Sequence, residues 1–354
     1  MKSNMSVLAC SALWALAPHA LAQKAAAPID LGTLGGSYSA ANGINTGDVV
    51  VGGGNVFTDV YEHAFYTNSL GYLEDLESLI GVYGNSVAAS ISTKGDIAGT
   101  SDQIIDSYGD TASHAFYFVS SRTGLVDLGT NGGTLAQGNA TQSGMVVGAS
   151  TVAQDVAYVA FVWTSAKGMV NLNTLAGDFG LEGYNSYAFG MNTKGLAVGN
   201  SDSPDGTTHA VTWNLKTDAI RDLKSLGGSY AQVNAVNDSN FMVGFSTLPG
   251  DAQTNAFVSN GGTPVDIGNL GGSYAQANSV NDSGAVVGSS NITGDTDVHA
   301  FVWTQAGGMV DLNSLPGLNG SAFIELNSAN AIAADGTIVG VGTALDGQFH
   351  AFVW

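Results

Sequence analysis

The stretch HAFVWTQAGGMVDL, His299–Leu312, contains two short runs rich in β-branched, aromatic and aliphatic residues around a glycine-containing turn. We interpret His299–Trp303 and Gly308–Leu312 as two strands of a hairpin. Versions of this hairpin recur along the chain. The chain ends within one of them, at His350–Trp354, and a counterpart of the missing second strand lies at Ile29–Leu31. A repeat divided between the two ends predicts a ring that the ends of the chain close together.

A unit of four expected strands repeats through the chain. The second expected strand of each unit ends in glycine, at Gly52, Gly99, Gly148, Gly199, Gly244, Gly288 and Gly340. These seven positions lie 44 to 52 residues apart, which is near the period of a propeller blade. The sequence therefore predicts an all-β fold: a seven-bladed β-propeller of four-stranded blades, whose N-terminal strand completes the last blade. A β-solenoid is the alternative, but it needs no divided repeat.

Side-chain size distinguishes the inner from the outer strands of the expected blade. The middle of the first strand holds residues no larger than serine, namely Gly43, Ser90, Ala140, Gly190, Ala235, Ser279 and Ala331. The third strand carries a phenylalanine in six units, namely Phe65, Phe116, Phe161, Phe257, Phe301 and Phe352. A blade that is narrow inside and bulky outside is wedge-shaped. We therefore expect the first strand to lie at the axis of the ring.

Three recurring motifs also carry a family resemblance. The HAFVW strand, the VDL–GGSY passage and the VVG strand together resemble the HAF-type probable extracellular repeat family of bacterial secreted proteins, over residues 28–354. The chain departs from the motif at Tyr158–Phe161 and Asn255–Phe257, where the histidine is missing, and at Val211, which replaces the phenylalanine. The resemblance implies secretion and a repeat fold. It implies no catalytic residues.

The first 22 residues have the features of a secretory signal peptide: Lys2 at the start, an apolar run over Met5–Ala17, and a cleavage motif at Ala20–Ala22. We expect a mature chain of residues 23–354 that forms a single β-propeller domain of repeats of about 47 residues each. The only cysteine, Cys10, lies in the signal, so the mature chain would have no disulfide. The sequence predicts a secreted monomer, periplasmic or extracellular, that is not embedded in a membrane.

The net negative charge argues against nucleic acid as a partner. The chain has 9 Lys+Arg and 29 Asp+Glu, and removal of residues 1–22 takes Lys2 and no acid, which leaves 8 − 29 = −21. Such a surface would repel nucleic acid. The expected loops between second and third strands contain acids and no Lys or Arg: Asp59, Glu62, Asp102, Asp106, Asp110, Asp155, Asp202, Asp205, Asp251, Asp295, Asp297 and Asp346. Calcium is the cofactor that these oxygen ligands suggest, bound by Asp102, Asp106 and Asp110 in one loop and by Asp295 and Asp297 in another.

Two polar residues recur at fixed places in the repeat. Histidine begins the third strand at His63, His114, His209, His299 and His350. An acid lies in the fourth strand at Asp30, Asp75, Asp127, Asp222, Asp266 and Asp311. A ring of metal ligands is one interpretation of the histidines, but equivalent positions of different blades lie far apart, whereas metal ligands must converge. Acid and base work at a glycosidic bond is one interpretation of the acids, but one acid per blade at a fixed register indicates a repeated structural hydrogen bond. We therefore interpret both residues as structural hydrogen-bonding groups.

The remaining functional signal lies in the segments between blades. Tyr38, Tyr230 and Tyr274, with Gln232 and Gln276, are the candidate ligand-binding residues, and packing of each tyrosine on its neighbour is the alternative. We find no zinc-binding helix, phosphate loop or nucleophile elbow, so no catalytic residue is assigned. We expect a non-catalytic binding or scaffold protein whose ligand, a glycan or a protein, binds on the loop face. A glycan-active hydrolase or lyase that uses loop-face carboxylates is the alternative.

Overall fold

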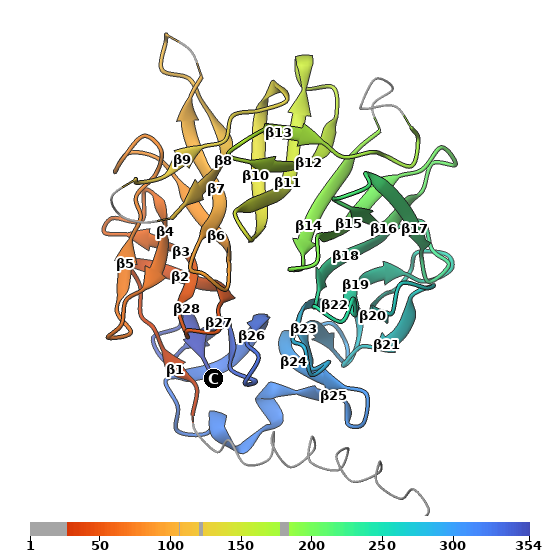
Figure 1. Ribbon diagram of the computed structural model, residues 1–354. Coiled ribbons are helices and arrows are strands. Elements are labelled where there is room, and N and C mark those ends of the chain that lie inside the picture. Colours follow the sequence, from red (N-terminus) through yellow and green to blue (C-terminus); the bar gives the residue numbers. More distant parts are fainter. Residues whose placement is uncertain (1–26, 106, 120–122, 178–183) are drawn as a thin grey trace, which may run out of the picture.

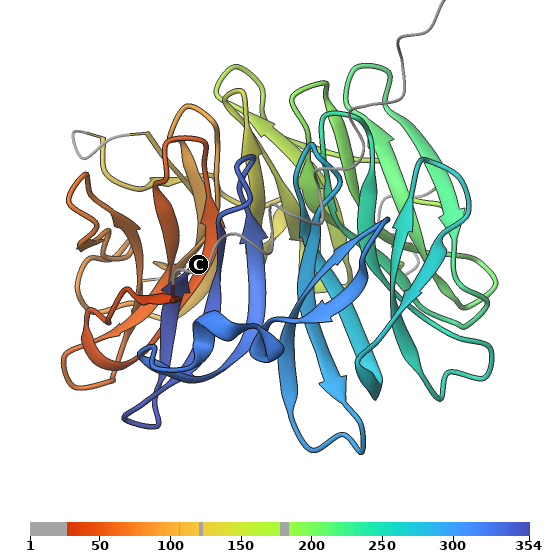
Figure 2. The same cartoon turned by 90° about the horizontal axis from the view of Figure 1, so that it is seen from below.

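The computed structural model describes residues 27–105, 107–119, 123–177 and 184–354. The expected signal peptide, residues 1–22, and Asp106 lie outside these ranges. The described residues form an all-β protein with three short 3-10 helices. The sheets stand side by side around a common centre (Figure 1), and their strands run between two faces that carry the loops (Figure 2).

Consecutive strands pair antiparallel in sets of four, and in each set the first strand lies innermost in Figure 1. The strands are β1 (Ile29–Asp30), β2 (Gly35–Ile44), β3 (Val50–Val56), β4 (Glu62–Thr67), β5 (Leu73–Asp75), β6 (Ser86–Ile91), β7 (Ile97–Ile104), β8 (Thr111–Phe118), β9 (Val126–Asp127), β10 (Gly132–Gln142), β11 (Met145–Val152), β12 (Tyr158–Thr164), β13 (Gly168–Asn171), β14 (Ser186–Met191), β15 (Leu196–Asp202), β16 (Thr208–Asn214), β17 (Ala219–Lys224), β18 (Ala231–Val236), β19 (Met242–Thr247), β20 (Thr254–Ser259), β21 (Val265–Gly268), β22 (Gly271–Val280), β23 (Val286–Ile292), β24 (Val298–Thr304), β25 (Gly308–Asp311), β26 (Phe323–Ile332), β27 (Ile338–Ala344) and β28 (Phe349–Val353). The 3-10 helices are η1 (Ala153–Asp155), η2 (Leu312–Ser314) and η3 (Pro316–Leu318).

The first and last strands of the described chain belong to one set. β1 pairs antiparallel with β28, with Ile29 opposite Val353 and Asp30 opposite Phe352. In Figure 1, β1 lies close to the C-terminus. The next set begins at β2, which touches β28 through a single parallel bridge between Tyr38 and Phe349. The expected pairing of Ile29–Leu31 with the final strand is therefore present in the structure.

Every first strand contains a β-bulge at the same place. The register shifts skip one residue in each set, namely Asn42, Ala89, Asn139, Phe189, Asn234, Asn278 and Asn330. Where this residue is asparagine, its side chain donates to a backbone oxygen of the next set, for example Asn42 to Ala88 at 3.1 Å and Asn330 to Ala41 at 2.9 Å. A bulge leaves backbone groups of the strand without a partner in the sheet. The asparagine therefore donates to a backbone oxygen that the hydrogen bonds between strands leave unpaired.

The glycine that ends each second strand has no space for a side chain. A Cβ on any of the seven would overlap a backbone oxygen of the first strand. In several sets it would also press on the third-strand phenylalanine, as Gly288 would on Phe301 at 2.8 Å. The six phenylalanines themselves are fully buried. The glycine therefore lets first, second and third strands approach closely, with the aromatic ring filling the space between sets.

The hydrophobic core of the described residues is divided into seven clusters, each between neighbouring sets. One cluster packs Val50 and Phe65 against Val339 and Ala351, so it joins the two ends of the chain. Each set is thus packed against its neighbours on two faces, and both faces are too hydrophobic to be left in water. This arrangement explains why the strands do not alternate strictly between apolar and polar residues.

Candidate functional site

The recurring histidines and aspartates pair with each other within five of the sets. The Nδ1 to carboxylate distances are 2.7–3.1 Å, in the pairs His63–Asp75, His114–Asp127, His209–Asp222, His299–Asp311 and His350–Asp30. The last pair joins β28 to β1. In another set, Asn255 replaces the histidine and donates to Asp266 at 2.9 Å. An amide can replace the imidazole because the pair needs only a donor at this place. The structure thus supports the structural interpretation of these residues.

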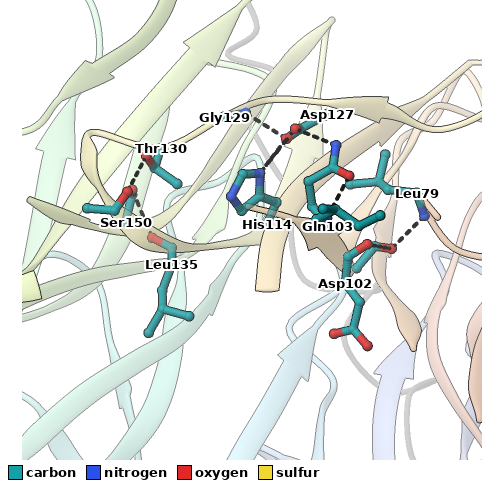
Figure 3. A network of polar contacts seen from close by, with 12 residues as sticks. Leu79, Asp102, Gln103, His114, Asp127, Gly129, Thr130, Leu135 and Ser150 are labelled. Atoms are coloured by element: carbon teal, nitrogen blue, oxygen red, sulfur yellow. Dashed lines mark hydrogen bonds and ion pairs between the residues drawn. The ribbon is translucent and has the colours of Figure 1, made fainter. Parts of the chain in front are cut away.

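Asp127 shows what each pair does locally (Figure 3). Its carboxylate accepts hydrogen bonds from His114, from the backbone N–H of Gly129 and from the Gln103 side chain. Burial raises the pKa of Asp127, but the hydrogen bonds from His114, Gly129 and Gln103 outweigh it and lower the pKa to about 2. The aspartate therefore fixes the turn that follows the fourth strand and stays ionised at neutral pH.

The loop face is the face that carries the loops between second and third strands and the connections between sets. Four of its acids hold these connections in place, since Asp59, Asp155, Asp251 and Asp295 accept backbone N–H bonds of 2.6–2.8 Å from Ser37, Thr134, Ser229 and Ser273. All four aspartates have positive φ. Hydrogen bonds lower the pKa of each carboxyl: the backbone bonds contribute most at Asp59 and Asp295, and the Thr151 and Thr247 side chains contribute most at Asp155 and Asp251. These four acids of the loop face are therefore structural caps, a role the sequence did not reveal.

The residues expected to bind calcium differ in their surroundings, and two of them already accept hydrogen bonds from the protein. Asp102 accepts bonds from the backbone N–H and side chain of Asn85, at 2.8 and 2.9 Å. Asp295 accepts from Ser273, while Asp297 is exposed and Asp110 lies in the β7–β8 loop. In the described ranges, no group of three or more His, Cys, Asp or Glu side chains is arranged to hold a metal ion. Asp106 lies outside those ranges, so calcium binding stays a prediction.

Two of the predicted tyrosines lie in a chain of hydrogen bonds with their glutamines. Asn200 donates to the Tyr230 hydroxyl at 2.8 Å, and this hydroxyl donates to Gln232 Oε1 at 2.8 Å. Gln232 Nε2 then donates to Asn234 Oδ1 at 2.7 Å. Tyr274 repeats part of the arrangement, because its hydroxyl donates to Gln276 at 2.8 Å. The hydroxyls are therefore held in fixed positions before any ligand arrives.

The tyrosine arc is our name for Tyr158, Tyr187, Tyr230, Phe245 and Tyr274. Ring centroids are 5.3 Å apart for Tyr158–Tyr187, 5.7 Å for Tyr230–Phe245 and 5.9 Å for Phe245–Tyr274. All five rings are half-buried. Burial, with smaller contributions from Tyr158, Asp202 and Tyr230, raises the pKa of Tyr187 to about 12. The arc spans four neighbouring sets and joins rings that the sequence places up to 116 residues apart (274 − 158 = 116).

Tyr38 does not belong to the tyrosine arc. It lies on β2, and its neighbour is Glu62, a half-buried carboxyl at the start of β4. Burial and the nearby Glu62 charge raise the pKa of Tyr38, and burial raises the pKa of Glu62. The five predicted ligand residues are thus divided: Tyr230, Gln232, Tyr274 and Gln276 lie together, and Tyr38 lies apart.

A cavity of about 200 Å³ lies where the first strands meet. Its lining includes all seven small residues that the sequence placed at the axis, from Gly43 to Ala331. The five bulge asparagines and Phe189 also line it. Phe189 stacks on Tyr187, with centroids 5.9 Å apart and an interplanar angle of 13°, so the cavity and the tyrosine arc are in contact. We call this space the axial cavity.

Sequence reasoning missed Asn200, Tyr187, Phe189 and Phe245. Tyr187 and Phe189 sit at the positions that Gln232 and Asn234 hold in another set, so an alignment of the repeats could have found them as substitutions. Asn200 and Phe245 follow the second-strand glycines and carry no signal of their own. Their contacts depend on how neighbouring sets are rotated about the centre.

Comparisons with known proteins add a fold but no family. No protein-family model matches the chain, and a search of curated proteins found no match. Among solved structures, the β-propeller domain of the Trilobed protease from Pyrococcus furiosus is 10% identical, over 90% of this chain and 95% of that chain, with a TM-score of 0.55. This likeness shows that the chain has a β-propeller fold.

Two further structures are more distant. TolB from Acinetobacter baumannii is 10% identical over 92% of this chain and 65% of that chain, with a TM-score of 0.43. Aleuria aurantia lectin, in complex with alpha-methyl-L-fucoside, is 13% identical over 79% of this chain and 96% of that chain, with a TM-score of 0.37. At these scores neither carries an argument about this chain. The described part of the chain has no helix with the length and hydropathy of a membrane span.

Proposed function

We propose that the chain is a seven-bladed β-propeller closed by its own first strand. Three contacts between the two ends of the chain support closure: the β1–β28 pairing, the His350–Asp30 pair at 2.9 Å, and the bond from Asn330 to Ala41 at 2.9 Å. Each of the sets β2–β5, β6–β9, β10–β13, β14–β17, β18–β21, β22–β25 and β26–β28 with β1 would be one blade. The resemblance to HAF-type repeats and the single domain over residues 23–354 belong to this proposal.

The proposed function is non-catalytic binding on the loop face, with a glycan as ligand. The tyrosine arc is the observation that carries it: half-buried aromatic rings over four neighbouring sets, with the amides of Asn200, Gln232 and Gln276 beside them. Sugars present flat C–H surfaces to aromatic rings and hydroxyls to amides, so this combination suits them. A protein ligand is the other class that this surface could bind.

The proposed location is outside the cytoplasm, in the periplasm or the medium, and the proposed state is a monomer. The expected signal peptide over residues 1–22 supports this location. Polysaccharides are exposed to proteins in both places. A formal charge of −20 would weaken contact with anionic polymers, so neutral glycans fit best.

Retention on polysaccharides tests the binding function. Purified protein is passed over gels that contain neutral polysaccharides, and the same samples are assayed for new reducing ends or unsaturated products. We expect retention without product, and loss of about tenfold in affinity for Tyr230→Ala and Tyr274→Ala. Tyr72→Ala is the matched control, since Tyr72 is 68% exposed in a turn on the opposite face. Equal loss in all three variants would contradict the assignment of the arc.

One observation favours an enzyme as the second candidate. Burial raises the pKa of Glu62, while hydrogen bonds from Ser37 lower the pKa of Asp59 in the same loop. Carboxyls whose pKa values are pushed apart are typical of acid and base pairs at a glycosidic bond. A hydrolase or lyase that uses Glu62 would release product from a glycan, and Glu62→Gln would abolish that release without loss of retention.

A further inference from the structure

The axial cavity has a polar but uncharged lining. Nineteen residues line its volume of about 200 Å³, and none is Asp, Glu, Lys, Arg or His, although the chain contains 29 acids. The polar groups are the five bulge asparagines and two serines. A charged ligand would lose its hydration here without gaining a counter-charge, whereas an apolar ligand would leave amides unpaired. The lining therefore favours a neutral, polar ligand.

The asparagines keep part of their hydrogen-bonding capacity free. Each uses Nδ2 to reach a backbone oxygen of the next set, as Asn139 does to Ala188 at 2.9 Å and Asn278 to Ala329 at 3.0 Å. These bonds fix the amide planes. Among the described residues, none donates a hydrogen bond to Oδ1 of Asn42, Asn139 or Asn278. Three oriented acceptors from three different sets thus remain available in one small space.

Phe189 supplies an aromatic surface in the same cavity. It occupies the bulge position that asparagine holds in five sets, so it is a departure from the repeat. Its ring stacks on Tyr187 with an interplanar angle of 13°, and Tyr187 belongs to the tyrosine arc. Gln232 makes a second connection, because it bonds both Tyr230 and Asn234. The axial cavity is therefore continuous with the proposed binding surface through side chains that touch.

We infer that the axial cavity takes one terminal ring of a neutral sugar, held against Phe189 and hydrogen-bonded by the free asparagine oxygens. The inference rests on the proposed glycan-binding function and adds the mode: the chain end enters the cavity, and the following units lie over the tyrosine arc. Its volume is below the roughly 300 Å³ of a drug-sized pocket, which suits a single ring. Hydroxyl donors of the sugar would face acceptors to which none of the described residues donates.

Phe189→Asn tests this inference with little risk to folding. The variant restores the residue that five sets already carry, so we expect an unchanged or higher melting temperature. Calorimetric titration with glucose, galactose, mannose and N-acetylglucosamine should give binding of at least one sugar to the wild type, and at least tenfold weaker binding to the variant. Tyr72→Ala is the matched control, because it removes an aromatic ring that is 68% exposed on the opposite face and leaves the axial cavity intact. Its affinity should stay within about twofold of the wild type.

The outcomes separate this inference from the proposed function. If Phe189→Asn and Tyr274→Ala each reduce retention on a neutral polysaccharide, the axial mode and the loop-face function are both supported. If only Tyr274→Ala reduces it, the loop-face function stands and the axial mode is wrong. Absence of binding by all four sugars to the wild type, or equal binding by galacturonate, would also overturn the axial mode. Absence of retention on every polysaccharide would overturn the proposed function itself.

Discussion

Gly288→Ala should destabilise the protein strongly, although it adds only one methyl group. The new Cβ would overlap the backbone oxygen of Gln276 and would lie 2.8 Å from Phe301 Cε1 and Cζ. A flexible side chain could yield, but the oxygen belongs to the innermost strand β22, and Phe301 is fully buried. Insertion of a methyl group into a packed core costs about 1–3 kcal/mol, and a backbone overlap places this variant at about 3 kcal/mol or more.

Guanidinium unfolding followed by tryptophan fluorescence measures this effect. Gly262→Ala is the matched control, because a Cβ there would meet no atom within 4 Å, and we expect a change within about 0.5 kcal/mol. Gly199→Ala should behave like Gly288→Ala, since its Cβ would overlap the backbone oxygen of Tyr187. A free energy of unfolding for Gly288→Ala within about 0.5 kcal/mol of the wild type would refute the packing explanation of the seven glycines.

Three further predictions concern the polar contacts. Asn330→Ala removes the bond to the Ala41 oxygen and should lower the free energy of unfolding by about 1 kcal/mol in denaturant titrations, whereas no change would contradict its role in joining the chain ends. Because the folded pKa of Asp127 is about 2, below its unfolded value of about 3.9, its stabilisation is complete above pH ~4 and lost towards pH ~2. Asp127→Asn should reduce the fall in the free energy of unfolding between pH ~4 and pH ~2 by about 1 kcal/mol, after allowance for solvent screening. An unchanged fall over this pH range would contradict the stabilising role of the His114–Asp127 pair. Asp295→Ala should speed amide exchange at Ser273 at least tenfold by mass spectrometry, and an unchanged rate would show that the carboxylate does not hold this segment.

The strands and their order within a set could be predicted because each depends on local pattern. The second-strand glycine, the third-strand phenylalanine and the small residue near the axis all recur at one period, and the structure places them as expected. The His299–Asp311 pair was missed as a pair, although the two residues lie on adjacent antiparallel strands only 12 residues apart. The recurrence of each residue indicates a structural hydrogen-bonding group, but it does not show that the two groups bond each other.

The contacts between sets could not be predicted from the sequence. Asn42 bonds Ala88 across 46 residues, and Tyr158 stacks on Tyr187 from another set. Such contacts depend on the angle between neighbouring sets, which a repeat period does not contain. The loop acids were misleading for a different reason. Charge counting cannot show that a carboxylate such as Asp295 accepts a backbone N–H of Ser273.

A crystal structure with a neutral oligosaccharide bound tests the central claim most directly, because it places the ligand on the molecule without assuming a site. Our account predicts density on the loop face beside Tyr230 and Tyr274, with one ring in the axial cavity against Phe189. Density confined to the outer edges of the sets or to the opposite face would contradict it.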